Sequence, residues 1–151
     1  MTDDRARTKT GALEVVREIA RRGGHEIRNA LNGVAVNAEV VRSRSERSSG
    51  GAELVPFAER AVLQVGVANA LTEGLLALMG CVMTAQADGT LRVVPGHGAG
   101  SQIELMIYGE RAEALVFAIK RFAQMVGVAV EQSGERVILT LSPEGKTNSK
   151  E

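Results

Sequence analysis

His25 and its neighbours are the side chains of this sequence best suited to covalent chemistry. The run from His25 to Val34 reads His-Glu-Ile-Arg-Asn-Ala-Leu-Asn-Gly-Val, so an acid, Glu26, directly follows the histidine. A neutral imidazole nitrogen is a competent nucleophile near physiological pH, and guanidinium groups beside it can hold phosphoryl oxygens during attack. The residue types therefore indicate phosphoryl transfer through His25.

The periodicity around His25 predicts an exposed position on a helix. Seam residues recur at spacings of four and three, as on a helix in a bundle: Ile27, Leu31, Val34, Ala38 and Val41. Because His25 lies two residues before Ile27, it projects about 200° away from that seam. The neighbours of His25 on the helix surface are polar or cationic: Arg21, Arg22, Arg28, Asn29 and Asn32. We expect the three arginines and Asn32 to bind phosphate or an acidic partner.

This run resembles the H-box of the dimerisation and phosphotransfer (HisKA-like) domain of bacterial sensor histidine kinases. The usual pattern is His-Glu-hydrophobic-Arg/Lys-Asn/Thr-Pro-Leu-Asn/Thr, followed by a small residue and Ile/Val. Eight positions match in register: His25, Glu26, Ile27, Arg28, Asn29, Leu31, Asn32 and Val34. Ala30 stands where the family has proline, so the residue that kinks the family's helix is missing.

The resemblance implies catalytic roles for three residues. His25 would be phosphorylated on a ring nitrogen, and Glu26 would accept a proton or orient the imidazole. Asn29 would position water for dephosphorylating a partner. Without the motif, we would interpret His25 as an ordinary surface residue and the arginine-rich face around it as an ordinary solvated surface.

Two helices joined by a polar connector are predicted to position His25. The first spans residues 11–44, and its pair Gly23-Gly24 predicts either a bend that leaves room for a docking partner or a break between two shorter helices. Residues 43–51 are rich in serine and glycine and are predicted to form the connector. Pro56 fits the first turn of the second helix, whose seam residues are Ala61, Val65, Ala68, Thr72, Leu75 and Met79.

Residues 11–82 are therefore predicted to form an antiparallel helical hairpin, the dimerisation and phosphoacceptor domain. Two helices cannot shield both seams from water, whereas two hairpins paired around a twofold axis form a four-helix bundle. We therefore expect a homodimer. The resemblance implies the same arrangement, with both histidines on the outside of the bundle.

Residues 83–144 are predicted to form a small α/β sandwich, which makes the fold class α+β. Strands are expected at 91–94, 102–108, 128–131 and 136–141, with a hairpin turn at Ser133-Gly134. A helix is expected at 110–126, with these residues available for burial: Ala114, Phe117, Ile119, Phe122, Met125 and Val126. This order resembles a truncated kinase ATP-binding domain. Residues 1–10 and 145–151 are expected to be disordered.

The boxes that hold nucleotide in such a domain are missing. The run 118–124 has no asparagine for a magnesium-binding motif, and residues 142–145 do not lead into Asp-x-Gly-x-Gly. The loop 96–100 is glycine-rich, but it precedes a strand and is better interpreted as a connector than as a phosphate cradle. His97 lacks a nearby ligand set. ATP, other cofactors and metals are therefore not expected on this chain, and neither is autokinase activity.

Composition favours a small cytoplasmic protein. Eighteen basic and eighteen acidic side chains cancel, so binding to nucleic acid or to a membrane surface is not indicated. Cys81 is the single cysteine, no signal peptide is visible, and the apolar segments look too short to cross a bilayer.

A phosphoacceptor without an ATP site must obtain phosphate from a partner. The resemblance implies a dimeric histidine phosphotransferase of a bacterial two-component phosphorelay, which exchanges phosphate with receiver-domain aspartates. Magnesium would arrive with the receiver. Two alternatives stay open: a kinase-derived phosphatase or kinase fragment that acts on a response regulator, and a non-catalytic dimeric scaffold that binds receivers.

Overall fold

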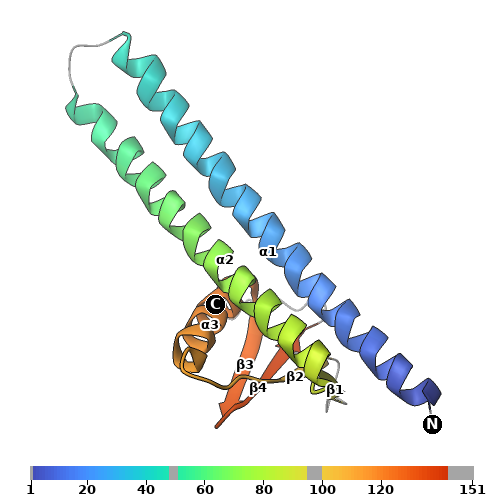
Figure 1. Cartoon of the computed structure of the whole chain (residues 1–151). Coiled ribbons are helices and arrows are strands. Elements are labelled where there is room, and N and C mark those ends of the chain that lie inside the picture. Colours follow the sequence, from blue (N-terminus) through green and yellow to red (C-terminus); the bar gives the residue numbers. More distant parts are fainter. Residues whose placement is uncertain (1, 48–50, 95–99, 143–151) are drawn as a thin grey trace, which may run out of the picture.

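Two long helices form the frame of the protein. The computed structural model describes residues 2–47, 51–94 and 100–142. Helix α1, Thr2–Ser45, and helix α2, Val55–Asp88, are joined through the short 3-10 helix η1, Ala52–Leu54, and lie side by side as an antiparallel hairpin (Figure 1). Helix α1 begins at Thr2, earlier than residue 11, and is helical where a disordered N-terminus was expected. It continues through Gly23-Gly24, so the predicted break between two shorter helices is wrong.

Helix α2 is longer and more apolar than expected. It ends at Asp88, beyond the boundary predicted at 82/83, and is capped by Gly89, whose φ of 71° lets its N–H reach the carbonyls of Ala85 and Gln86. The stretch Ala52–Asp88 is long and apolar enough to cross a membrane by length and composition, so the expectation that every apolar segment is too short is wrong. Core helices of soluble proteins also meet this criterion, and 39% of the apolar window is buried.

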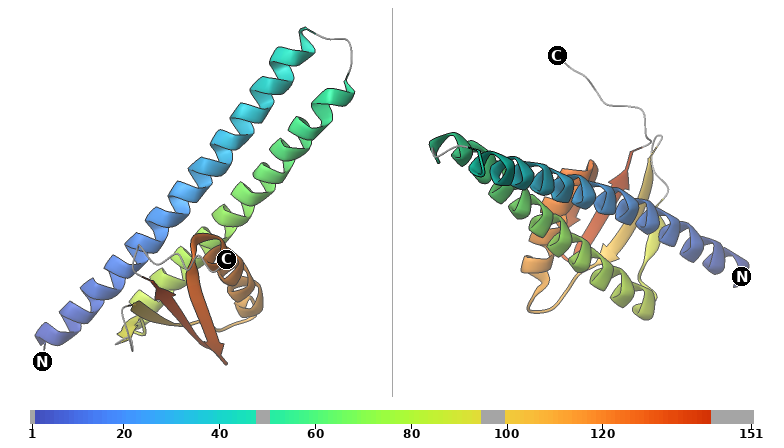
Figure 2. Two further views of the ribbon diagram at one scale, coloured as in Figure 1. Left: turned by 180° about the vertical axis from the view of Figure 1, so that it is seen from behind. Right: turned by 90° about the horizontal axis from the view of Figure 1, so that it is seen from above.

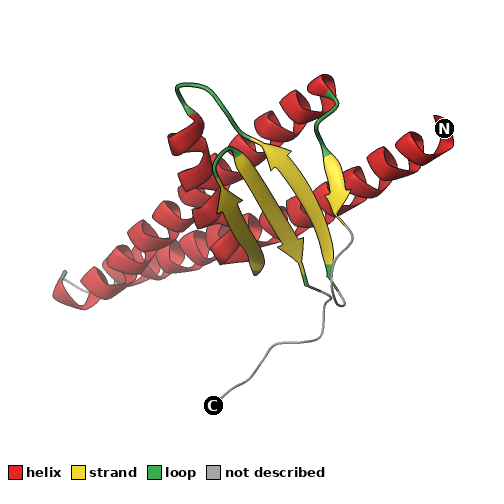
Figure 3. Ribbon diagram, turned by 90° about the horizontal axis from the view of Figure 1, so that it is seen from below, coloured by secondary structure: helices red, strands yellow, loops and turns green. Residues whose placement is uncertain are grey.

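The C-terminal region forms a four-stranded antiparallel sheet and one helix, which confirms the α+β class. The strands are β1, Arg92–Val94; β2, Ser101–Met106; β3, Val128–Ser133; and β4, Arg136–Leu141. Their order in the sheet is β1-β2-β4-β3, and α3, Ala112–Val126, connects β2 to β3. Helices cover one face of the sheet (Figure 3). The loop 95–99, which includes His97, and residues 143–151 lie outside the described residues.

Alternation along the strands explains which face is covered. Ile103 and Leu105 of β2 are buried, as are Val137 and Leu139 of β4. The intervening residues point to the other face, where the Nε of Arg136 donates to a carboxylate oxygen of Glu104 at 2.8 Å. The turn between β3 and β4 contains Gly134, whose φ of 60° suits a tight hairpin.

The hairpin and the sheet share one hydrophobic core. It joins residues 12–19 of α1 and 71–85 of α2 to the inner face of the sheet and to α3. In α3 the buried face runs through Val116, Ile119, Phe122 and Val126. Phe117 was expected to be buried but is 68% exposed, because it lies two residues before Ile119 and so projects about 200° away from it. Ala114 is exposed as well.

The distal half of the hairpin has no core of its own. No described residue in 31–47 or 51–67 is buried. The sheet and α3 pack only against the other half, so the two helices continue alone toward their connector (Figures 1 and 2). A four-helix bundle would require a second hairpin beside this half, and the dimer stays a prediction.

Phe122 fixes α3 against both helices of the hairpin at the level of His25. Its side chain is fully buried. A Cβ on Gly23 would lie 2.7 Å from the ring of Phe122. A Cβ on Gly74 would collide with the Cβ of Phe122 and lie 2.7 Å from the carbonyl oxygen of Ala118. Only glycine allows this close approach, so the two glycines form a socket for Phe122.

The socket predicts opposite effects for two adjacent glycines. Gly23→Ala should lower the free energy of unfolding by about 1–3 kcal/mol, because the new methyl group overpacks against Phe122. Gly24→Ala is the matched control, since a Cβ there meets no atom within 4 Å, and should raise it by about 0.5–1 kcal/mol. Urea unfolding at one protein concentration measures both variants. Equal stabilities would contradict the packing described for Phe122.

Candidate functional site

His25 lies on an exposed face of α1, in the half of the hairpin that carries the core. Arg28, Asn29 and Asn32 on the same helix are exposed as well. Behind them, Ile27 packs against the core and Ala30 is buried. The exposure expected for His25 from the periodicity is therefore present, and the imidazole is open to a partner.

The imidazole makes no recorded polar contact. Within the part of the chain that the structure describes, no side-chain hydrogen bond or ion pair involves His25, Glu26, Arg28, Asn29 or Asn32. Glu26 is half-buried and is not hydrogen-bonded to His25, because adjacent residues on a helix diverge by about 100°. The role predicted for Glu26 toward the imidazole stays a prediction.

Ala30 keeps the helix regular at the position where the resemblance would place proline. Helix α1 is uninterrupted from Thr2 to Ser45. Alanine keeps the backbone N–H that proline lacks, and it has the highest helix propensity of all residues. The histidine is therefore presented on an unbroken helix.

The seam predicted on α1 is only partly covered. Ile27, Val34 and Val41 are half-buried, but Leu31 is 53% exposed and Ala38 is also exposed. The buried line of α1 instead runs through Ala12, Val16, Ile19 and Ala30. Leu31 and Ala38 lie at the side of the hairpin, where no other described part of the chain covers them.

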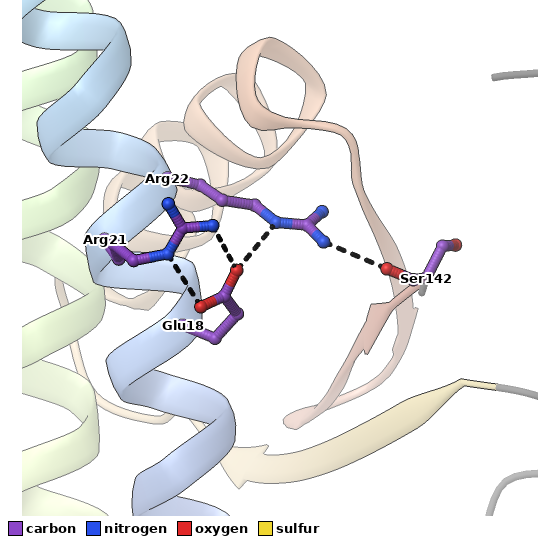
Figure 4. A network of polar contacts seen from close by, with 4 residues as sticks. All are labelled: Glu18, Arg21, Arg22 and Ser142. Atoms are coloured by element: carbon purple, nitrogen blue, oxygen red, sulfur yellow. Dashed lines mark hydrogen bonds and ion pairs between the residues drawn. The ribbon is translucent and has the colours of Figure 1, made fainter. Parts of the chain in front are cut away.

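Arg21 and Arg22 lie about one turn before His25 on α1. Both side chains are directed toward Glu18 (Figure 4). Arg21 donates to the two carboxylate oxygens of Glu18, from Nε at 2.9 Å and from Nη2 at 2.7 Å. The Nε of Arg22 lies 3.5 Å from the same carboxylate. The expected site around the imidazole is therefore divided: Arg28, Asn29 and Asn32 stay beside His25, while two arginines extend in the N-terminal direction.

Arg22 also ties the hairpin to the end of the sheet. Its Nη2 donates to the carbonyl oxygen of Ser142 at 3.0 Å, directly after β4. The Arg22 side chain is 17% exposed, against 57% for Arg21. Arg22 is thus held at both ends of its guanidinium, and its side chain is the more buried of the two.

The guanidinium groups shift the titration of Glu18. Hydrogen bonds from Arg21 are the largest cause that lowers the pKa of the Glu18 carboxyl below its ordinary value, and the charge of Arg21 and contacts from Arg22 add to it. Partial desolvation opposes this shift. The carboxylate is therefore ionised at neutral pH and contributes a negative charge about two turns before His25 on α1.

A polar contact between the helices lies beyond the histidine motif. Asn37 donates to the carbonyl oxygen of Gly33 at 2.9 Å and to the side-chain oxygen of Gln64 on α2 at 3.0 Å. A Cβ on Gly33 would collide with the side chain of Gln64. The side chain of Gln64 thus occupies the space beside the small residue of the motif, and a larger residue there would displace the end of this flexible side chain.

Sequence reasoning missed Glu18, Ser142, Gln64 and the Phe122 socket. Glu18 could have been found, because its spacing of three and four from the arginines is the spacing of helical ion pairs. The other contacts join residues distant in sequence, and no local pattern signals them.

The remaining candidate features lie on other parts of the surface. A groove of about 270 Å³ between α2 and the end of β2 is mostly apolar and includes Leu76, Cys81, Met106 and Tyr108 in its lining. Burial raises the pKa of the Cys81 thiol, which favours the unreactive protonated form. Among the described residues, no group of three or more His, Cys, Asp or Glu side chains is placed to hold a metal ion.

No protein-family model and no curated protein matches this chain.

Proposed function

We propose that this protein is a histidine-containing phosphotransfer protein of a bacterial two-component phosphorelay, located in the cytoplasm. The observation that carries the proposal is the exposed imidazole of His25, with no recorded polar contact within the described residues, on an unbroken helix and inside the eight-position motif. A nucleophile that is already hydrogen-bonded must break that bond before it attacks, so a reactive nitrogen should be exposed and without such a bond. His25 satisfies that condition.

The proposed reaction is a reversible exchange of one phosphoryl group. A ring nitrogen of His25 attacks the phosphorus of an aspartyl phosphate on a receiver domain, and the bond between phosphorus and the carboxylate oxygen breaks. The aspartate leaves as a free carboxylate and His25 becomes phosphohistidine. The reverse attack by an aspartate of a second receiver completes the relay. Magnesium comes with the receiver.

The residues beside His25 have separate roles in the proposed transfer. Arg28 lies three residues after His25 on the same helix, so its guanidinium can pair with the oxygens of a phosphoryl group on His25. The side-chain amides of Asn29 and Asn32 can donate hydrogen bonds to the partner. We assign Glu26 to accept or hold the imidazole proton, because a carboxylate close to the ring stabilises its charged form. The nucleotide boxes are absent from the sequence, so the phosphate donor in this proposal is a protein and not ATP.

Exposed apolar residues along α2 support a homodimer. Val62 and Leu76 of α2, fourteen residues apart, are 71% and 68% exposed, and Val55 and Met83 continue the same heptad line, which Asn69 interrupts. A line of exposed apolar residues at heptad spacing is the seam that another helix covers. Two hairpins that bury these lines and the Leu31 side of α1 would make the four-helix bundle, with His25 on its outer surface.

A phosphatase is the second candidate, and Asn29 is the observation that favours it. Asn29 is exposed one turn after His25, where its amide can orient water toward a partner's phosphoaspartate. In that case His25 need not carry phosphate. A scaffold that only binds receivers would need neither residue for turnover.

Transfer to His25 is the first prediction of this proposal. Wild-type protein mixed with ³²P-phosphorylated receiver domains should gain acid-labile, base-stable label, and His25→Ala should gain none. Asn29→Ala should still accept label, because it leaves the nucleophile in place. Autoradiography of gels run without acid fixation measures the transfer.

The same mixtures separate the alternatives. Receiver dephosphorylation that persists in His25→Ala and fails in Asn29→Ala would support the phosphatase and contradict the relay. Receiver binding without any turnover would support the scaffold. Labelled ATP alone should leave the wild type unlabelled, and labelling would overturn the proposal that its phosphate comes from a protein.

A charge on the heptad line should dissociate the dimer. We predict that Val62→Glu is monomeric by light scattering at concentrations where the wild type is dimeric, because dimerisation would bury an unpaired carboxylate. Val36→Glu is the matched control: Val36 is 63% exposed and lies two residues from Val34, so it projects about 200° from the α1 seam. This variant should stay dimeric. A monomeric wild type, or equal effects of both changes, would contradict the bundle.

A further inference from the structure

The two helices of the distal half stay side by side although this half has no core. No described residue of 31–47 or 51–67 is buried, yet α1 and α2 remain paired up to their connector (Figures 1 and 2). The seam residues here, such as Val34, Val41 and Ala61, are small and bury little apolar surface. Isolated helices of up to about 15 residues are marginal in water. Other contacts are therefore needed to keep this half closed in a single chain.

Two side-chain contacts cross between the helices in this half. The Nδ2 of Asn37 on α1 donates to the Oε1 of Gln64 on α2 at 3.0 Å. The guanidinium carbon of Arg44 on α1 lies 5.0 Å from the ring centre of Phe57 on α2. Arg44 comes seven residues after Asn37, and Phe57 comes seven residues before Gln64. Because the helices are antiparallel, the two contacts are layers of one seam, one heptad apart in the same register.

Neighbouring groups hold the side chains of both layers in place. The Nδ2 of Asn37 also donates to the carbonyl oxygen of Gly33 at 2.9 Å, and the end of the Gln64 side chain fills the space over Gly33. Arg60 adds a second guanidinium near the ring of Phe57, at 5.2 Å from its centre. Asn37 and Gln64 are half-buried, so their hydrogen bond is partly shielded from water.

We propose that the pairs Asn37–Gln64 and Arg44–Phe57 form a clasp that keeps the distal half of the hairpin closed in a single chain, so that its dimer surface is already formed before association. The inference rests on the homodimer of the proposed function, because the clasp prepares the surface that the second copy covers. A surface formed in advance loses less conformational entropy on binding. The opposite case is a distal half that is open in the single chain and folds only as the dimer forms.

The amide pair of the clasp lies off the proposed dimer surface. Asn37 comes one residue before Ala38, so it projects about 100° away from the side that Ala38 shares with Leu31. Gln64 comes two residues after Val62, so it projects about 200° away from the heptad line of α2. Substitutions of this pair therefore test closure of the single chain and remove no residue that the second copy would cover.

The test measures hydrogen exchange of the single chain by mass spectrometry. The single chain is obtained with Val62→Glu, or by dilution of the wild type below the dissociation constant of the dimer. Exchange of residues 31–47 and 51–67 is compared among Asn37→Ala, Gln64→Ala, the double variant and Asn32→Ala. Asn32→Ala is the matched control: it gives the same gain in helix propensity at an exposed position without a recorded side-chain contact among the described residues.

We expect both segments of the single chain to exchange more slowly than an unstructured chain, by about tenfold or more. Asn37→Ala should speed their exchange about two- to tenfold relative to Asn32→Ala, which is the range for the loss of one hydrogen bond. In the double variant Asn37→Ala should add little, because its partner is already gone. Exchange at the unstructured rate, equal rates in Asn37→Ala and Asn32→Ala, or simply additive effects at 37 and 64 would overturn the inference.

The outcomes separate this inference from the proposed function. If light scattering shows that the wild type is a monomer, the proposed bundle fails, and the preparation of a dimer surface by the clasp fails with it. If the wild type is a dimer and the distal segments of the single chain exchange like an unstructured chain, only the inference about the clasp fails.

Discussion

The close contact of Phe122 with Gly23 and Gly74 is the constraint on which the rest of the structure depends. It brings α3 against both helices of the hairpin, and the sheet follows because α3 is joined to it by short connections. The shared core then stiffens α1 from Ala12 to Ile19, directly before His25. An aromatic ring packed between two helical glycines is a steric device, since any larger residue at either position would force α3 away. The C-terminal region is in this way fixed to the hairpin beside the histidine.

Polar contacts add a second tie at the same level. Arg22 reaches from α1 to the carbonyl of Ser142, and Glu18 orders both arginines. Glu18 is partly solvated, so these contacts direct side chains more than they stabilise the fold. Because its folded-state pKa is lowered, their small contribution is present above the carboxyl's ordinary titration range and is lost as the pH falls through the folded-state value. On the face of α1 that carries His25, these contacts thus order the two arginines before the histidine. The polar residues that follow His25 on this face stay exposed.

Local patterns were enough to predict the elements, and distant contacts were not. The helical hairpin, four strands, α3 and the exposure of His25 follow from periodicity and turn residues. Phe117 and Leu31 were assigned to buried faces, but Phe117 projects away from the α3 core and Leu31 lies beside the α1–α2 contact. Gly23 was recognised as unusual, yet its partner is Phe122, about a hundred residues later. The arginines were placed around the imidazole because helix spacing is symmetric, while Glu18 draws them to one side.

The central claim is that His25 carries the phosphoryl group, and mapping the modified residue tests it most directly. The intact protein is incubated with a phosphorylated receiver, digested at neutral pH to preserve phosphorus–nitrogen bonds, and analysed by mass spectrometry with fragmentation that retains phosphohistidine. The account predicts one phosphoryl group on the imidazole of His25. Phosphate on another residue, such as His97, or no phosphopeptide while the receiver loses its phosphate to water, would contradict it.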